Sequence, residues 1–192
     1  MIERRQAVRA LLSDRGELLV VAGLGSPCYD VRAAGDHPLN FYNWGAMGSA
    51  VMVGLGLALS RPTQPVLVLV GDGEMLMGLG SLATLAQHKP ANLSIVILDN
   101  EEYAETGMQE TATAFGVDLA AVATACAAPW SQTLKNAENV SALKDAIHRC
   151  DCLKVAVLKI AKGDVPRTIP IRDGVTIKTR FRSHLLGSHV EP

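Results

Sequence analysis

Short unbroken apolar runs alternate with longer segments of helical spacing along this chain of 192 residues. Unbroken apolar runs are typical of strands that are covered on both faces. Such runs occupy residues 18–22 and 66–70. Mostly apolar segments at residues 93–98 and 155–160 are also expected to be strands, and residues 39–44 form a further candidate strand. Helical spacing is found at residues 3–12, 46–60, 75–88, 118–127 and 141–150, and a Ser-Pro pair at 26–27 is typical of another helix start.

This alternation predicts an α/β fold. Strands joined by helices give a three-layer arrangement, with a mainly parallel sheet and helices on both faces. We find no internal repeat and expect one domain at residues 1–165. Residues 101–113 are polar and lack a clear period, which is typical of a functional loop. Residues 166–192 are expected to form a C-terminal tail that wraps the domain or contacts a partner.

Composition and charge argue against several classes of protein. A net charge of −1 and an aromatic content of 4% disfavour a nucleic-acid-binding protein, which usually has a basic face or stacking side chains. The longest apolar stretch, residues 46–59, is too short and too rich in glycine to cross a membrane, so no membrane role is expected. The four cysteines lack metal-binding spacing and are expected to be reduced thiols of a cytoplasmic protein.

The polar residues that end two neighbouring strands form the most informative pattern. Gly71-Asp72-Gly73 follows one buried strand, and Asp99-Asn100 follows the next. In an open parallel sheet the carboxyl ends of neighbouring strands share one edge, where ligands bind. We therefore expect Asp72 and Asn100 to lie close together at that edge.

These residue types suit a complex of Mg²⁺ with a diphosphate. Mg²⁺ prefers oxygen ligands and commonly binds one or two carboxylates together with phosphate oxygens. Gly71 and Gly73 allow the backbone to approach phosphates, and the free N–H groups of a following helix attract anions. In a purely structural alternative, the tripeptide is a tight turn with Asp72 as the helix cap. The matching position of Asp99-Asn100 favours the ligand site.

Other candidate features have simpler interpretations. Gly54-x-Gly56 lies within a helical pattern and indicates close helix packing, because the third glycine of a dinucleotide site is missing. The chain contains no Gly-x-x-x-x-Gly-Lys phosphate loop. His37 precedes a strand near the expected site and is interpreted as a turn residue, with an acid–base role as the alternative.

Several motifs follow one another in a recognisable order. They are Pro38-Leu39-Asn40-Phe41-Tyr42, Gly45-Ala46-Met47-Gly48, Gly54-Leu55-Gly56-Leu57-Ala58-Leu59, Gly71-Asp72-Gly73-Glu74-Met75-Leu76-Met77, Gly80-Ser81-Leu82-Ala83-Thr84, Asp99-Asn100 and Thr106-Gly107-x-Gln109. Together they resemble the diphosphate-binding domain of thiamine diphosphate-dependent 2-oxo acid decarboxylases. Within that family the chain most resembles the sulfopyruvate and phosphonopyruvate decarboxylases. The likeness runs from about residue 3 to residue 182.

The resemblance implies thiamine diphosphate and Mg²⁺ as cofactors. Asp72 and the side-chain oxygen of Asn100 would bind Mg²⁺, with the backbone carbonyl of Glu102 as a third ligand. Met47 would be the bulky residue that wedges the cofactor into a bent, V-shaped conformation. The carbonyl of Gly45 would accept a hydrogen bond from the 4′-amino group of the cofactor. Met47 and Gly45 are therefore the expected catalytic positions.

Further cofactor contacts are implied by the same resemblance. Gly71, Gly73, Glu74 and Tyr103 are expected at the cofactor, with the backbone N–H groups of Gly73 and Glu74 on the diphosphate. Glu74 stands where a small or hydroxyl residue is common, and its carboxylate would be repelled unless it points away from the diphosphate. Asp99 replaces the first residue of the commoner Asn-Asn pair.

The resemblance also implies a partner, because a glutamate on a separate pyrimidine-binding domain activates the cofactor in this family. With one expected domain, the chain requires a pyrimidine-binding α-type subunit to carry this glutamate. We therefore predict the β-type subunit of a carboxy-lyase for a small 2-oxo acid, inactive alone and present at least as a homodimer within a hetero-oligomer. The open alternatives are another thiamine diphosphate reaction, such as carboligation or oxidative decarboxylation, and a non-catalytic cofactor-binding subunit.

Overall fold

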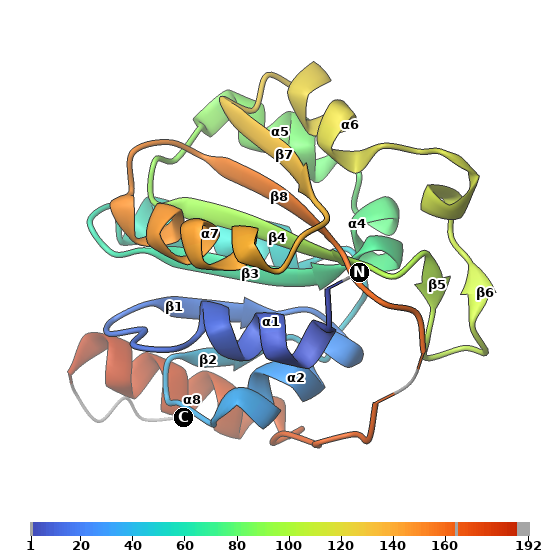
Figure 1. Cartoon of the computed structure of the whole chain (residues 1–192). Helices are drawn as coiled ribbons and strands as arrows, with labels where there is room; N and C mark the ends of the chain where they lie inside the picture. The colour runs from blue at the N-terminus through green and yellow to red at the C-terminus, as the bar shows by residue number, and fades with distance from the viewer. Residues whose placement is uncertain (1, 164, 188–192) are drawn as a thin grey trace.

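The computed structural model describes residues 2–163 and 165–187, and within these ranges a six-stranded sheet lies between helices (Figure 1). Neighbouring strands of this sheet run parallel in the order β2-β1-β3-β4-β8-β7. The strands are β1 (Leu19–Ala22), β2 (Asn40–Tyr42), β3 (Val66–Gly71), β4 (Leu93–Asp99), β7 (Trp130–Leu134) and β8 (Lys154–Lys159). The predicted three-layer α/β fold is confirmed.

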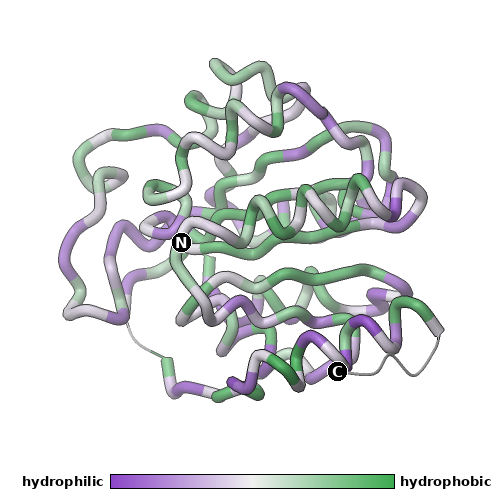
Figure 2. Tube along the Cα trace, turned by 180° about the vertical axis from the view of Figure 1, so that it is seen from behind, coloured by the Kyte–Doolittle hydropathy of each residue, from purple (hydrophilic) through white to green (hydrophobic). Residues whose placement is uncertain are grey.

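Alternate residues of the central strands face the two helical layers. In β3, Val66, Val68 and Val70 belong to one buried cluster, and Leu67 and Leu69 belong to the other. Both faces of β3 are therefore covered, which explains its unbroken apolar sequence. Figure 2 shows the same distribution, with largely hydrophobic strands inside and more polar segments in the connecting loops.

The helices form one layer on each side of the sheet (Figure 1). One face is covered by α1 (Arg4–Leu11), α2 (Ser26–Ala34) and α7 (Glu138–Arg149), and the other by α3 (Ala50–Ser60), α4 (Asp72–Met77), α5 (Ser81–His88) and α6 (Leu119–Ala125). A further helix, α8 (Gly174–Leu186), packs beside β2. Because Ile177 belongs to one core cluster and Phe181 to the other, α8 straddles this edge of the sheet.

One predicted helix is broken in the structure. The spacing predicts a single helix over residues 75–88, but α4 and α5 are separate helices there. The break occurs where Gly78 packs against the backbone of Gly48, so closely that a Cβ on Gly78 would come within 2.5 Å of the Gly48 carbonyl oxygen. The prediction was wrong because this contact between distant segments interrupts a pattern that is locally helical.

The helix predicted from residue 46 also begins later, at Ala50. Gly48 has a left-handed φ of 86°, so the chain turns before the helix starts. The sequence did not predict β7, whose residues are half-buried or exposed at the edge of the sheet. An edge strand with one covered face needs no unbroken apolar run.

The loop expected at residues 101–113 contains short elements. They are β5 (Glu102–Tyr103), β6 (Gln109–Glu110) and the 3₁₀ helix η1 (Ala112–Phe115), and β5 pairs with β6 in antiparallel orientation. In Figure 1 this β5–β6 segment extends from the sheet at the end where β3 and β4 finish. Helix α8 was also not predicted, since only Ile177 and Phe181 are buried along it.

Two observations on the described residues concern the cysteines and the apolar helices. The four cysteines are free thiols. The most buried of them, Cys28, contacts the carbonyl of Ala22 at 3.4 Å, and burial raises the pKa of its thiol well above the usual value. In residues 2–163 and 165–187, no helix has the length and apolarity needed to cross a membrane.

Candidate active site

A cavity of about 70 Å³ lies at the carboxyl ends of β3 and β4. This is the edge at which open parallel sheets bind ligands. The start of α2 and the β5–β6 segment complete its wall. The sequence-predicted residues on this wall are Met47, Gly71, Asp72, Gly73, Glu74, Asn100, Glu102 and Tyr103. Gly45 is exposed and lies outside the wall.

Asp72 begins α4 directly after β3, and only 1% of its surface is exposed. Its Oδ2 accepts hydrogen bonds from the hydroxyls of Thr111 at 2.6 Å and Thr113 at 3.2 Å. Burial raises the pKa of Asp72, the hydrogen bond from Thr111 opposes this change, and the charge of Asp99 adds to it. Both hydroxyls contact Oδ2, and neither contacts the other carboxylate oxygen.

Asp99 ends β4 and is linked to Asp72 through Thr113. Its Oδ1 accepts hydrogen bonds from the Thr113 hydroxyl at 2.8 Å and from the backbone N–H of Glu101 at 3.1 Å. Its Oδ2 accepts one from Nζ of Lys159 at 2.9 Å. Lys159 is the last residue of β8 and lies opposite Asp99 in the strand register. A positive charge therefore stands beside the second carboxylate of the site.

Asn100 turns the chain from β4 into β5. Its Oδ1 accepts a hydrogen bond from the backbone N–H of Glu102 at 3.2 Å, and Glu101 between them has a left-handed φ of 64°. A non-glycine residue in this region is uncommon and often occurs at functional sites. The turn places Asn100 and Glu102 on the same cavity wall as Asp72.

The oxygen atoms of this wall fit Mg²⁺. A carboxylate, an amide oxygen and a backbone carbonyl are the hard ligands that Mg²⁺ prefers, and the ion usually keeps further positions for phosphate oxygens and water. Within the part of the chain that the structure describes, no group of three or more His, Cys, Asp or Glu side chains could hold a metal ion. The set of Asp72, Asn100 and Glu102 requires no such group, because only one of its three ligands would be a carboxylate.

The turn after β3 accommodates an aromatic ring. Tyr103 of β5 packs against Gly73, where a Cβ would come within 2.4 Å of Cε1 of the ring. Gly71 has open space at the equivalent position. Glycine is therefore required at position 73 by the fold of the β5–β6 segment itself.

The buried side chain of Glu74 is held by backbone amide groups. It is 2% exposed, and its Oε2 accepts a hydrogen bond from the N–H of Leu24 at 3.0 Å. It lies so close to Gly23 that a Cβ there would come within 2.0 Å of Oε2. Burial raises the pKa of Glu74 to about 7, although the amides of Gly48, Leu24 and Ala50 act to lower it. Oε2 therefore has a fixed partner, whereas Oε1 is buried without a hydrogen-bond partner among the described residues.

Met47 is half-buried on the cavity wall, in the turn that precedes α3. The next residue, Gly48, packs against Gly78 at the end of α4. This contact fixes the turn that carries Met47 relative to the turn that carries Asp72.

His37 has the structural role expected of a turn residue. Its Nδ1 accepts a hydrogen bond from the backbone N–H of Leu39 at 3.1 Å, and its ring meets that of His184 edge-on. Burial lowers the pKa of His37. It lies outside the cavity wall.

Several residues that line the cavity or contact Asp72 and Asp99 were not identified from the sequence. Thr111 and Thr113 lie in the polar loop, and their only signal is a Thr-x-Thr pattern. Lys159 lies at the end of a largely apolar strand. A single lysine in that position is only a weak indication of a functional site. Arg4 lines the cavity from the start of α1 and forms a buried ion pair with Asp30.

One protein family matches most of this chain. Its description is "Thiamine pyrophosphate enzyme, C-terminal TPP binding domain", and the match covers residues 25–160. This range contains the sequence-predicted site residues from Gly45 to Tyr103.

Curated relatives carry decarboxylase names. Sulfopyruvate decarboxylase subunit beta of Methanothermobacter thermautotrophicus is 46% identical over 123 residues, which are 64% of this chain and 65% of that protein. The subunit of the same name from Methanocaldococcus jannaschii is 33% identical over 180 residues, 93% of this chain and 95% of that one. Phosphonopyruvate decarboxylase of Streptomyces hygroscopicus is 42% identical over 160 residues, 81% of this chain and 35% of that protein. The chain thus spans from about one third to nearly all of the length of these relatives.

A solved structure shows the same fold. Benzoylformate decarboxylase from Polynucleobacter necessarius superposes with a TM-score of 0.69 at 21% identity, over 86% of this chain and 34% of that chain. Together with the family match over residues 25–160, these comparisons show that the chain belongs to the thiamine pyrophosphate enzyme family and contains its C-terminal TPP binding domain.

Proposed function

We propose that this chain is the β-type subunit of a thiamine diphosphate- and Mg²⁺-dependent decarboxylase of a small 2-oxo acid. The observation that carries the proposal is the presence of Asp72, Asn100 and Glu102 on one cavity wall at the carboxyl ends of β3 and β4. The names of the relatives support a substrate similar to sulfopyruvate or phosphonopyruvate.

In this proposal the chain anchors the diphosphate through Mg²⁺. Asp72, the amide oxygen of Asn100 and the backbone carbonyl of Glu102 hold the ion. The backbone N–H groups of Gly73 and Glu74 bind phosphate oxygens, and Gly71 and Tyr103 complete the contacts. Bound there, thiamine diphosphate supplies the electron sink that decarboxylation of a 2-oxo acid requires.

Met47 and Gly45 are proposed to shape the bound cofactor. Met47 projects from a turn that is fixed by the contact between Gly48 and Gly78, so it can act as a firm wedge. Gly45 lies two residues earlier, is exposed, and would offer its carbonyl oxygen to the 4′-amino group.

The small size of the cavity supports a shared active site. Its volume of about 70 Å³ is well below the roughly 300–1,000 Å³ of typical small-molecule pockets. We infer that a pyrimidine-binding α-type subunit covers it and supplies the activating glutamate, within a hetero-oligomer that contains at least a homodimer of this chain. Relatives named subunit beta support this arrangement.

The division of the chain into residues 1–165 and 166–192 is part of the same proposal. The first range would form the diphosphate-binding domain, and the second would contact a partner. Ile169, Val175 and Leu186 are exposed apolar side chains in the second range. Residues 188–192 lie outside the described residues.

The proposal can be tested in two steps. The full chain is co-purified with an α-type subunit, and CO₂ release is then measured with a panel of 2-oxo acids. We expect release that requires both subunits, thiamine diphosphate and Mg²⁺, with sulfopyruvate or phosphonopyruvate among the best substrates. Decarboxylation by the purified chain alone would contradict the shared site. Formation of a carboligation product in place of the aldehyde that remains after loss of CO₂ would contradict the assigned reaction.

A further inference from the structure

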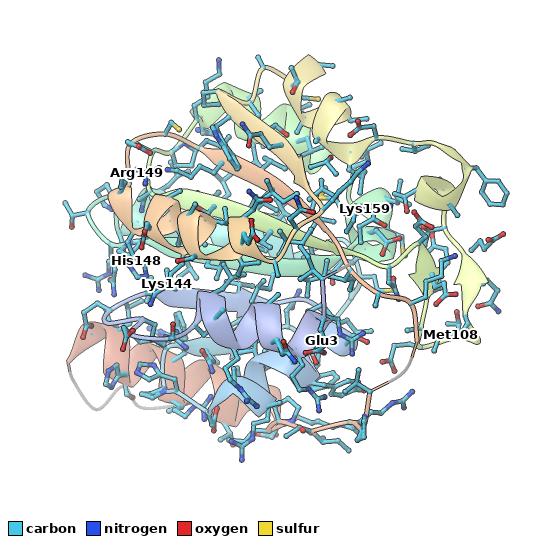
Figure 3. The ribbon with its side chains drawn as sticks, in the orientation of Figure 1. Glu3, Met108, Lys144, His148, Arg149 and Lys159 are labelled. Atoms are coloured by element: carbon cyan, nitrogen blue, oxygen red, sulfur yellow. The ribbon has the colours of Figure 1, made fainter. Side chains whose placement is uncertain are left out.

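Lys159 lies beside the candidate Mg²⁺ ligands but is not one of them. Its Nζ is 2.9 Å from Oδ2 of Asp99 and 2.5 Å from Oε1 of Glu101, and its side chain is 23% exposed. Figure 3 shows Lys159 toward the side of the molecule from which β5 and β6 extend, away from Lys144 of α7. The position at the end of β8 brings a lysine from a distant part of the chain to this site.

The charge of Lys159 compensates an otherwise unfavourable pair of carboxylates. Asp72 and Asp99 are 1% and 3% exposed, and the hydroxyl of Thr113 contacts both of them. Two like charges that are buried and share one contact residue destabilise each other. An ammonium group on the far oxygen of Asp99 offsets this repulsion.

The hydroxyl protons indicate how Asp99 acts on Asp72. Each threonine hydroxyl can donate only one proton. The shortest contacts assign the proton of Thr111 to Asp72, at 2.6 Å, and the proton of Thr113 to Asp99, at 2.8 Å. Asp99 therefore fixes the orientation of Thr113. The oxygen of Thr113 lies 2.9 Å from that of Thr111 and 3.2 Å from Oδ2 of Asp72, so a Thr113 hydroxyl held by Asp99 leaves Thr111 as the donor to Asp72.

We propose that Lys159 is a positioning residue for the Mg²⁺ ligand Asp72 and that it acts through Asp99 and Thr113. This inference rests on the proposed function, because it takes Asp72 as a ligand of Mg²⁺. Lys159 donates to Oδ2 of Asp99, and Oδ1 of Asp99 accepts the proton of Thr113. Thr111, which contacts Thr113, donates to Oδ2 of Asp72. The other oxygen of Asp72 is thereby oriented toward the cation.

The chemistry of the contact makes residues 99 and 159 a matched pair. An asparagine at position 99 would keep an acceptor for Thr113, but its amide N–H groups would then face the ammonium group of Lys159. Two donors that face each other without an acceptor are unfavourable when partly buried. Replacement of Lys159 by methionine removes this conflict, so the two positions are compatible again when Asp99→Asn and Lys159→Met are combined.

The test compares Asp99→Asn, Lys159→Met and the double variant in the full chain, co-purified with its partner. Calorimetry gives the Mg²⁺ concentration that supports half-maximal binding of thiamine diphosphate, and thermal unfolding without ligand gives the intrinsic stability. Loss of a residue that orients a metal ligand typically weakens metal affinity about 10–100-fold. We expect each single variant to need at least about tenfold more Mg²⁺, and the double variant to return to within about threefold of the wild-type protein by coupling between the two sites.

Lys162→Met is the matched control. Lys162 is 42% exposed, lies 3.6 Å from Oε2 of Glu101 and also pairs with Glu102 and Glu110 instead of Asp99. Its replacement removes a neighbouring positive charge but leaves the contact with Asp99 intact. We expect the Mg²⁺ requirement of this variant to match that of the wild-type protein.

Each outcome separates this inference from the proposed function. Absence of Mg²⁺-dependent thiamine diphosphate binding in the wild-type complex would refute the function itself. Wild-type binding with an unchanged Mg²⁺ requirement in Lys159→Met would refute the positioning role. Single variants that lose affinity without recovery in the double variant would also refute it, as would a lower melting temperature with an unchanged Mg²⁺ requirement.

Discussion

Gly73 meets two demands at once, since it follows a candidate metal ligand and lies beneath an aromatic ring. A Cβ at this position would come within 2.4 Å of Cε1 of Tyr103. Gly73→Ala must therefore displace Tyr103 and the β5–β6 segment. Overpacking of this kind costs about 1–3 kcal/mol. We expect a lower melting temperature and a weaker response to thiamine diphosphate, both measured by thermal unfolding.

Gly80→Ala provides the comparison for this prediction. Gly80 has open space around its Cβ position and helical dihedral angles, with φ −60° and ψ −20°. Alanine is therefore expected to be neutral or stabilising by about 0.4–1 kcal/mol. Equal effects of the two substitutions on the melting temperature would contradict the role assigned to Tyr103.

At the residue scale, the sequence predicted the residues that end a strand and begin a turn. Asp72 and Asn100 were identified because glycine and polar residues interrupt an apolar run. Thr111 and Lys159 could not be identified in this way, since their contacts depend on how a loop folds back and on which strand lies next to β4. The pairing of β4 with β8 arises from the fold of the whole sheet. The sequence around Lys159 therefore does not indicate that this residue lies next to Asp99.

At the scale of elements, α3 packs closely on β3 through a glycine. A Cβ on Gly54 would come within 2.2 Å of Cγ2 of Val68. Gly54→Ala is therefore expected to push the helix from the sheet and to destabilise the protein by about 1–3 kcal/mol. Gly56, two residues later, has open space, so Gly56→Ala should stabilise the helix by up to about 1 kcal/mol. Chemical denaturation of both variants gives the comparison, and destabilisation by Gly56→Ala would contradict it.

The docking of α8 on β2 is expected to depend on pH through Asp36. Its Oδ2 accepts a hydrogen bond from Arg180 at 2.8 Å, and its Oδ1 accepts one from the hydroxyl of Tyr42 at 2.9 Å. Partial burial acts to raise the pKa of Asp36, but these hydrogen bonds and the nearby arginines hold it below its ordinary value of 3.8. The stabilisation is therefore complete above that value and is lost as the pH falls through the lower pKa of the folded state.

Asp36→Asn measures this contribution. At pH 7 the variant should be less stable by about 0.5–1 kcal/mol, as for a partly exposed ion pair. That difference corresponds to a melting temperature roughly 1–4 °C lower in a chain of this size. The two proteins should converge as the pH falls toward 2. A difference that persists at low pH would show that the contact acts through packing and not through charge.

The elements predicted from sequence are those whose burial is complete. The central strands β3 and β4 are covered on both faces, so their largely apolar sequences identify them. The edge strand β7 and the helix α8 bury few side chains, and their sequences carry little periodicity. The break between α4 and α5 depends on the contact between Gly48 and Gly78, which joins segments that no local pattern connects.

At the scale of the whole molecule, cofactor binding should stabilise the folded chain. A ligand at one hundred times its dissociation constant adds about 2.7 kcal/mol when it binds only the folded state. This corresponds to a rise of roughly 5–11 °C in melting temperature for a chain of this length. We expect the rise with thiamine diphosphate and Mg²⁺ together in the complex with the α-type subunit, and its loss in Asp72→Ala. A rise that survives Asp72→Ala would contradict the assignment of this ligand.

Two exposed apolar residues, on α4 and η1, are candidates for the surface that the proposed α-type subunit contacts. Phe115 is 77% exposed in η1, two residues after Thr113, and Met77 is 63% exposed at the end of α4. Large apolar side chains exposed beside a cavity are typical of interaction surfaces. Because Thr113 contacts Asp72, a subunit that covers Phe115 would also close the candidate active site.

Phe115→Asp is therefore expected to weaken assembly with the α-type subunit by at least about tenfold, the equivalent of about 1.4 kcal/mol. The melting temperature of the chain alone should change little, because substitutions of exposed residues usually alter stability by less than about 0.5 kcal/mol. Phe115→Leu keeps an apolar side chain and should assemble nearly as well as the wild-type chain. Analytical ultracentrifugation gives the dissociation constants of the two variants and of the wild-type chain for comparison. If Phe115→Asp assembles as tightly as Phe115→Leu, Phe115 is not part of the surface that binds the α-type subunit.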